Sequence, residues 1–134
     1  MEPMKVEIHQ SSASVSEARI RQHKVLIDRP VGKGGEDKGA MGGELFLASV
    51  GGCFMSNLLA AIRARGAAVT DATAVVTGTL LESPARFVSI HVNVSAKYAE
   101  RAEFEKLVEI AERGCVMMNT LRGKLEVTVE IGGA

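Results

Sequence analysis

The sequence has few aromatic residues and no excess of charge of either sign. It contains no tryptophan, one tyrosine and four phenylalanines, so the aromatic share is 4%. Its 16 lysines and arginines balance its 16 aspartates and glutamates, and the formal net charge is zero. Proteins that stack nucleic-acid bases need more aromatic side chains, and anionic membranes or nucleic acids attract a basic surface. We therefore expect neither nucleic acid nor membrane as a partner.

Cysteine and histidine are also scarce. The two cysteines, Cys53 and Cys115, lie too far apart in the sequence for a CxxC redox motif or a zinc knuckle. The three histidines, His9, His23 and His91, share no metal-ligand spacing with one another or with a cysteine. The sequence therefore predicts no metal site and no bound cofactor.

The length and composition are those of a small globular protein. The chain has 134 residues, of which 46% are hydrophobic and 24% are charged, and this predicts one soluble domain over residues 1–134. The first residues, MEPMKVEIHQ, lack the basic segment and following apolar stretch of a secretory signal. We therefore expect a cytoplasmic location, where thiols are kept reduced.

The hydrophobic pattern predicts an α+β fold. Alternation of apolar and polar residues predicts strands, and helical spacing predicts two helices, with a short apolar turn over 116–121. The predicted strands cover 5–9, 19–28, 69–82, 86–96 and 125–131, and the predicted helices cover 44–65 and 100–113. The segment 30–43 has six glycines and must be a loop. The grouping predicts antiparallel strand pairing around a long buried central helix.

The central helix is apolar on all sides. Leu45–Ile62 carries no charge for 18 residues, which is close to the lower length limit of a membrane span. Its small and polar residues, such as Gly51, Gly52 and Asn57, favour a buried core helix instead. One small sheet can cover only one face of such a helix. We therefore expect a homodimer in which two central helices pack together.

The glycines beside Cys53 need an explanation. Each glycine inside a helix costs about 1 kcal/mol relative to alanine. The pair Gly51-Gly52 removes side chains next to Cys53, where something must approach closely. The alternative is that both cysteines are inert, buried structural thiols, since free cysteine is among the most buried residue types. The residues by themselves leave both interpretations open.

Three segments resemble the OsmC/Ohr family of osmotically induced and organic hydroperoxide resistance proteins. Residues 43–53, GELFLASVGGC, are similar to the family segment P-x-E-L-L-L-A-A-L-G-G-C. Residues 115–121, CVMMNTL, resemble its second signature, C-P-V-S-N-T-L, and residues 34–39, GGEDKG, resemble its GG-x-D-x-G stretch. With the order of strands and helices, the resemblance covers nearly the whole chain. It differs at Gly42 and Val116, where the family segments have proline.

The resemblance implies an OsmC-like fold, an intertwined homodimer and a thiol-dependent peroxidase that reduces organic hydroperoxides in oxidative stress defence. It implies that Cys53 attacks the peroxide and becomes a sulfenic acid. Cys115 would resolve that acid in a Cys53–Cys115 disulfide. It also implies an external dithiol reductant, a lipoylated or thioredoxin-like protein.

The resemblance further implies an arginine that activates Cys53 and an acidic residue that holds this arginine. Burial raises the pKa of a thiol, so a cation must oppose that effect. The arginine matches Arg19, or alternatively Arg21, and periodicity cannot choose between them because both would point to the same face of one strand. The acid matches Glu44. At about 100° per residue, nine residues place Glu44 roughly opposite Cys53 on a continuous helix. Glu44 can then hold the arginine only if the helix starts later or if a partner subunit supplies one of the groups.

Two other classes of function compete with the peroxidase. A binding module could hold a small lipophilic ligand in the apolar dimer groove, and ligand binding would then survive replacement of either cysteine. A purely structural or interaction protein would have inert thiols that alkylate slowly. The paired cysteine motifs favour the peroxidase.

Overall fold

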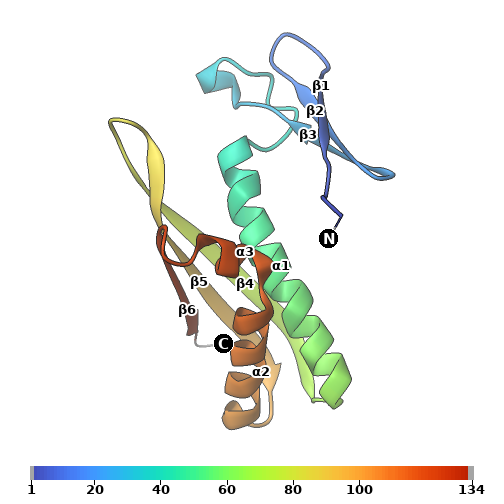
Figure 1. Ribbon diagram of the computed structural model, residues 1–134, viewed down its shortest axis with the longest axis vertical. Coiled ribbons are helices and arrows are strands. Elements are labelled where there is room, and N and C mark those ends of the chain that lie inside the picture. Colours follow the sequence, from blue (N-terminus) through green and yellow to red (C-terminus); the bar gives the residue numbers. More distant parts are fainter. Residues whose placement is uncertain (1, 133–134) are drawn as a thin grey trace. The chain divides into compact units, whose positions relative to one another are not determined.

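The computed structural model describes residues 2–132 and shows two three-stranded sheets and three α-helices. This confirms the predicted α+β class. The elements follow the order β1 (Glu7–Gln10), β2 (Ser16–Ile20), β3 (His23–Ile27), the 3-10 helix η1 (Val31–Lys33), α1 (Gly42–Arg65), β4 (Val69–Leu81), β5 (Arg86–Tyr98), α2 (Arg101–Gly114), α3 (Val116–Leu121) and β6 (Glu126–Ile131) (Figure 1). The chain divides into two compact units between Phe46 and Leu47, inside α1.

The first unit contains the antiparallel sheet β1-β2-β3. The prediction of one strand over 19–28 is wrong, because the chain turns at Arg21 and Gln22 and returns as β3. Arg21 has a φ of +55°, the left-handed conformation that tight two-residue hairpin turns require. Ile20 and His23 then pair across the turn. Arg21 therefore lies in a turn and not on a strand face shared with Arg19.

The glycine-rich loop after β3 is organised by one buried carboxylate. Asp28 is 3% exposed and accepts hydrogen bonds from the backbone N–H groups of Arg29 (2.7 Å), Glu36 (3.0 Å) and Lys38 (3.1 Å). Burial raises the pKa of Asp28, but these hydrogen bonds lower it by more, so the pKa lies below its ordinary value. Gly35 must be glycine because a Cβ would collide with the carbonyl of Arg29. The loop that leads into α1 is thus held in one conformation.

The second unit contains the sheet β4-β5-β6, in which β4 and β5 are antiparallel. The prediction of antiparallel pairing throughout is wrong for β6, which runs parallel to β5. The reason is the connection, since α2 and α3 carry the chain back across the sheet before β6 begins. The segment 116–121, expected to be an apolar turn, forms the helix α3.

One face of this sheet is buried and the other is polar, as the alternation in residues 86–96 predicts. The buried side chains of β5 alternate with half-buried polar ones. Helix α2 covers the same core with an apolar stripe. These buried residues are Ile90, Val92, Val94 and Ala96 of β5, and Phe104, Leu107, Val108 and Ala111 of α2.

Helix α1 lies against β4 and α2 (Figure 1). Among the residues described, it is the one helix long and apolar enough to cross a membrane by length and composition. In the single chain the buried residues of α1 lie on one side, as expected for a helix that one small sheet covers. These are Val50, Gly51, Phe54, Leu58 and Ala61. Leu59, by contrast, is 49% exposed, so the single chain leaves an apolar side of α1 uncovered.

Gly51 permits the close contact between α1 and β4. A Cβ at Gly51 would lie 2.6 Å from Cγ2 of Val76, whereas a Cβ at Gly52 would meet no atom of the chain. We expect Gly51→Ala to reduce the free energy of unfolding by roughly 1–2 kcal/mol, because overpacking outweighs the gain in helix propensity. Urea unfolding measures this loss. In the background of Val76→Ala the same substitution should be less damaging, and equal damage in both backgrounds would contradict the contact.

Candidate functional site

The structure brings the two cysteines together. Cys53 lies in the middle of α1, and Cys115 lies between the end of α2 and the start of α3. Both are free thiols, and they lie close enough for each to change the pKa of the other. Cys115 is fully buried, whereas Cys53 is only partly buried. Cys53 is therefore the more accessible of the two thiols in the single chain.

Contacts between the helices position this pair. The side-chain amide of Asn57, one turn after Cys53, donates a hydrogen bond to the carbonyl of Ala111 in α2 at 3.4 Å. Gly114 ends α2 directly beside the Asn57 side chain. These contacts hold the middle of α1 against the end of α2. Cys115 is the next residue after that end.

Cys115 is also the N-cap of α3. Its backbone is extended, with φ −75° and ψ 113°, which is typical of an N-cap residue. Its Sγ accepts a hydrogen bond from the N–H of Met118 at 3.5 Å, and its carbonyl accepts one from the N–H of Asn119 at 2.9 Å. The Sγ and the carbonyl of Cys115 therefore stabilise the first turn of α3 through these two hydrogen bonds.

The surroundings give the two thiols different acidities. Burial raises the pKa of Cys53, but hydrogen bonds from the Met117 N–H, the Cys115 thiol and the Val116 N–H lower it by more, so its pKa lies below the ordinary value. Burial raises the pKa of Cys115, and its hydrogen bond with Cys53 and the negative charge of that residue raise it further. Cys53 therefore ionises first, and Cys115 keeps its proton.

The sequence analysis did not predict that backbone amides affect the pKa of Cys53. It expected a cation to oppose the effect of burial on Cys53, and it did not name the backbone N–H groups of Val116 and Met117, which lower the pKa of Cys53. Cysteines at helix N-termini commonly have lowered pKa values. An amide is present at nearly every residue, so no residue type indicates it in advance.

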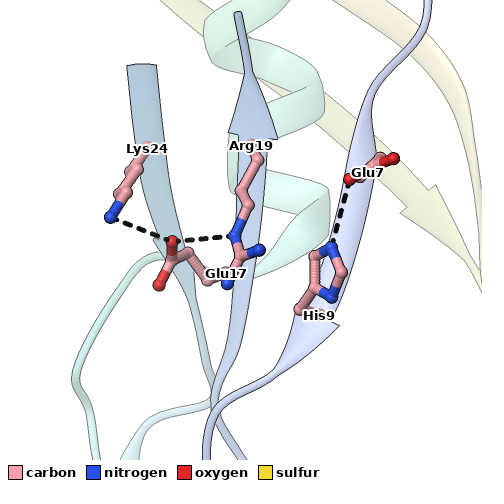
Figure 2. Close-up of polar contacts among 5 residues, drawn as sticks. All are labelled: Glu7, His9, Glu17, Arg19 and Lys24. Atoms are coloured by element: carbon pink, nitrogen blue, oxygen red, sulfur yellow. Dashed lines mark hydrogen bonds and ion pairs between the residues drawn. The ribbon is translucent and has the colours of Figure 1, made fainter. Parts of the chain in front are cut away.

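Arg19 lies on β2 and pairs with a residue of the same strand. Its Nε is 3.3 Å from Oε1 of Glu17, and the Nζ of Lys24 on β3 is 3.8 Å from the same oxygen (Figure 2). On the neighbouring strand β1, Nε2 of His9 lies 3.2 Å from a carboxylate oxygen of Glu7. The sequence reasoning did not name Glu17. The signal was its position two residues before Arg19, which places both on one face of a strand.

The other two predicted site residues, Arg21 and Glu44, lie in the β2–β3 turn and in the first turn of α1. Arg21 is exposed in the β2–β3 turn and lines a pocket with Met4, Val6 and Ile20. Glu44 lies in the first turn of α1, where its Oε1 accepts a hydrogen bond from the N–H of Met41 at 2.8 Å. The helix begins at Gly42, so the later helix start considered for Glu44 does not occur.

The two groups of predicted site residues belong to different units. Arg19, Arg21 and Glu44 lie in the unit that ends at Phe46, and both cysteines lie in the unit that begins at Leu47. Within residues 2–132 there is no group of three or more histidine, cysteine, aspartate or glutamate residues that could hold a metal ion. The chemistry that the second unit offers is therefore that of an ionisable thiol beside a protonated one.

Sequence comparison identifies the family. The family model described as OsmC-like protein matches residues 35–130, a range that contains both cysteines. This range covers more than half of the chain, and the protein therefore belongs to the OsmC-like family. No curated protein matches the sequence.

Solved structures share the fold along the whole chain. An OsmC-like protein from Mycoplasma pneumoniae matches with a TM-score of 0.85 and 17% identity, covering 98% of this chain and 96% of that one. An organic hydroperoxide resistance protein OsmC from Legionella pneumophila matches with a TM-score of 0.75 and 19% identity over 99% and 98% of the two chains. The organic hydroperoxide resistance protein OhrB of Bacillus subtilis matches with a TM-score of 0.72 and 19% identity over 98% of each chain. The fold is therefore OsmC-like, as the resemblance of the motifs implies.

Proposed function

We propose that this protein is a thiol-dependent peroxidase that reduces organic hydroperoxides in oxidative stress defence. The observation that carries the proposal is the pair Cys53 and Cys115, which lie close enough to affect each other's ionisation, so that the pKa of Cys53 is lowered and the pKa of Cys115 is raised. A peroxidase of this type needs one thiolate that attacks and one thiol close enough to complete a disulfide. The family agrees with this chemistry, and two structural relatives are named organic hydroperoxide resistance proteins.

The first step is attack of the Cys53 thiolate on the terminal peroxide oxygen. The O–O bond breaks, an S–O bond forms, and the alkoxide leaves and takes up a proton to become the alcohol. Sulfur is oxidised to a sulfenic acid while the hydroperoxide is reduced. Cys53 suits this role because it is the more exposed and the more acidic of the two thiols.

The second step is condensation of the sulfenic acid with Cys115. An S–S bond forms, the S–O bond breaks, and the thiol proton leaves with the hydroxyl group as water. Cys115 suits this role because it lies beside Cys53, and because the negative charge of Cys53 that raises the Cys115 pKa is gone once Cys53 is a neutral sulfenic acid. An external dithiol, a lipoylated or thioredoxin-like protein, then reduces the disulfide. Dithiol reductants of this kind act in a reducing compartment, and we place the protein in the cytoplasm.

An arginine completes the proposed site. Arg19 is our first choice as the cation beside Cys53, and Arg21 is the alternative. Its charge would add to the effect of the backbone amides on the Cys53 thiolate. Glu17 already holds the Arg19 side chain through the 3.3 Å contact. Glu44 is proposed to hold the arginine with one of the two groups supplied by the partner subunit.

We also propose that the protein is a homodimer that covers the exposed apolar side of α1. Sedimentation at micromolar concentration should give twice the chain mass of 14.2 kDa. Replacement of Leu59, which is 49% exposed in the single chain, by lysine should shift the equilibrium toward the monomer. A parent protein that sediments as a folded monomer would contradict this proposal.

Steady-state consumption of hydroperoxide tests the function. The protein, a dithiol reductant and cumene hydroperoxide should together give repeated turnovers, with one reductant oxidised for each peroxide consumed. The competing function is a binding module for a small lipophilic ligand. Tight binding of such a ligand without any peroxide turnover would show that the protein is a binding module and not a peroxidase.

A further inference from the structure

The last carbonyl groups of α2 have no donors inside that helix, as at every helix end. In this structure the segment that follows α2 supplies donors to two of them. The N–H of Cys115 donates to the carbonyl of Glu112 at 3.3 Å. The side-chain amide of Asn119, in α3, donates to the carbonyl of Arg113 at 3.0 Å. The end of α2 is therefore tied to Cys115 and to α3.

Asn119 holds the same junction with its other polar groups. Its backbone N–H donates to the carbonyl of Cys115 at 2.9 Å. Its side-chain oxygen accepts a hydrogen bond from Nη1 of Arg122 at 2.9 Å, and Nη2 of Arg122 lies 3.7 Å from a carboxylate oxygen of Glu112. The side chain of Asn119 thus joins Arg113, which precedes Cys115, to Arg122, which follows it.

Asn119 belongs to the second signature segment, residues 115–121, and the proposed mechanism does not use it. We infer that Asn119 is a positioning residue, which fixes the backbone on both sides of Cys115 and so holds its buried thiol where it can join Cys53. This inference rests on the proposed function, in which Cys115 completes the disulfide.

The residue before Cys115 makes such a constraint necessary. Gly114 has the wide backbone freedom of glycine, and a Cβ at this position would lie 3.4 Å from Nδ2 of Asn57. Without the hydrogen bonds of Asn119, rotation of the backbone at Gly114 would move the Cys115 thiol relative to Cys53. A mobile thiol loses more conformational entropy when the S–S bond forms, so the disulfide becomes less stable.

Asn119→Ala and Thr120→Ala form a matched pair of variants. Both residues are exposed in α3, and each loses its side-chain hydrogen bonds on replacement by alanine. The hydroxyl of Thr120 donates to the carbonyl of Val116 at 2.7 Å, a bond that lies entirely within α3. Thr120→Ala therefore leaves the junction between α2 and α3 intact, whereas Asn119→Ala releases it. Neither substitution changes the charge near the cysteines.

The test is the equilibrium between the reduced protein and the Cys53–Cys115 disulfide in glutathione buffers at pH 7. Two electrons and two thiol protons pass from the protein to oxidised glutathione, which leaves as two molecules of reduced glutathione. Acid quenching and mass spectrometry give the two protein forms. We expect Asn119→Ala to lower the equilibrium constant for disulfide formation about fivefold, as loss of one hydrogen bond predicts. Thr120→Ala should match the parent.

Urea unfolding of the reduced protein separates positioning from a merely structural role. If Asn119→Ala lowers the free energy of unfolding but keeps the parent glutathione equilibrium, the inference is overturned. A higher equilibrium constant in Asn119→Ala would also overturn it, since Asn119 would then hold Cys115 away from Cys53. An equal decrease in Thr120→Ala, or a parent that forms no such disulfide, would overturn it as well.

The glutathione titration uses no peroxide, so its failure is separable from failure of the proposed function. The predicted decrease in Asn119→Ala, in a protein whose parent consumes no hydroperoxide, would keep the positioning role and refute the peroxidase. Normal peroxide turnover with an unchanged equilibrium in Asn119→Ala would keep the peroxidase and refute the role of Asn119.

Discussion

Replacement of Cys53 by serine should abolish the consumption of organic hydroperoxide. The serine hydroxyl is a far weaker nucleophile at neutral pH, and the remaining thiol of the site, Cys115, is fully buried. The loss should amount to all turnover above the uncatalysed rate, measured by following cumene hydroperoxide in the presence of a dithiol. Cys53 is half-buried, so the variant should remain folded, which circular dichroism can check.

Replacement of Cys115 by serine is the matched comparison. Cys115→Ser should still react once, because Cys53 keeps the amide donors Val116 and Met117. It should then stop as a sulfenic acid that excess peroxide oxidises further. Equal loss of the first turnover in both variants would contradict the separate roles of the two cysteines.

Replacement of Arg19 by methionine should slow peroxide reduction by roughly tenfold or more. A guanidinium beside a partly desolvated thiolate is expected to contribute about 1.4 kcal/mol or more, and each 1.4 kcal/mol corresponds to a factor of ten. Because the cation stabilises the charged form, its removal should move the alkylation midpoint of Cys53 to higher pH. The measurement is iodoacetamide labelling across pH, combined with single-turnover kinetics.

Arg21→Met is the control for this experiment and should have the smaller effect. Arg21 lies exposed in a turn, whereas Arg19 is held on β2 by Glu17. A larger effect at Arg21 would make it the activating residue in place of Arg19. Parent-like pH profiles in both variants would refute the arginine proposal and leave the backbone amides as the source of Cys53 acidity.

Much of the second unit could be predicted from local patterns. The alternation in β5 indicated its buried face, since neighbouring strand residues point to opposite sides of a sheet. The helical spacing in 100–113 gave α2 to within one residue at either end. Where the spacing of apolar residues determines which side chains are buried, the sequence was sufficient to predict the element and its buried face.

The errors have physical causes that lie outside these patterns. The alternation in β6 is the same for a parallel and an antiparallel partner, so its direction depended on the α2–α3 connection. The turn at Arg21 uses a residue that rarely adopts a positive φ, and no glycine or asparagine marked it.

Only part of the candidate site could be predicted from the sequence. The adjacency of Cys53 and Cys115 was implied by the resemblance of their two motifs, and the structure places them in contact. The cause of the lowered Cys53 pKa was not foreseen, because it lies in the peptide groups of Val116 and Met117. A helix start supplies such donors through its geometry, whichever side chains it carries.

The most direct measurement of the peroxide-reducing cysteine pair is a thiol titration of the reduced protein before and after one equivalent of cumene hydroperoxide, followed by peptide mapping. We expect loss of both thiols, formation of one Cys53–Cys115 disulfide within the chain and release of one equivalent of the alcohol. Two intact thiols beside unreacted hydroperoxide, or a disulfide formed only between chains, would contradict the mechanism.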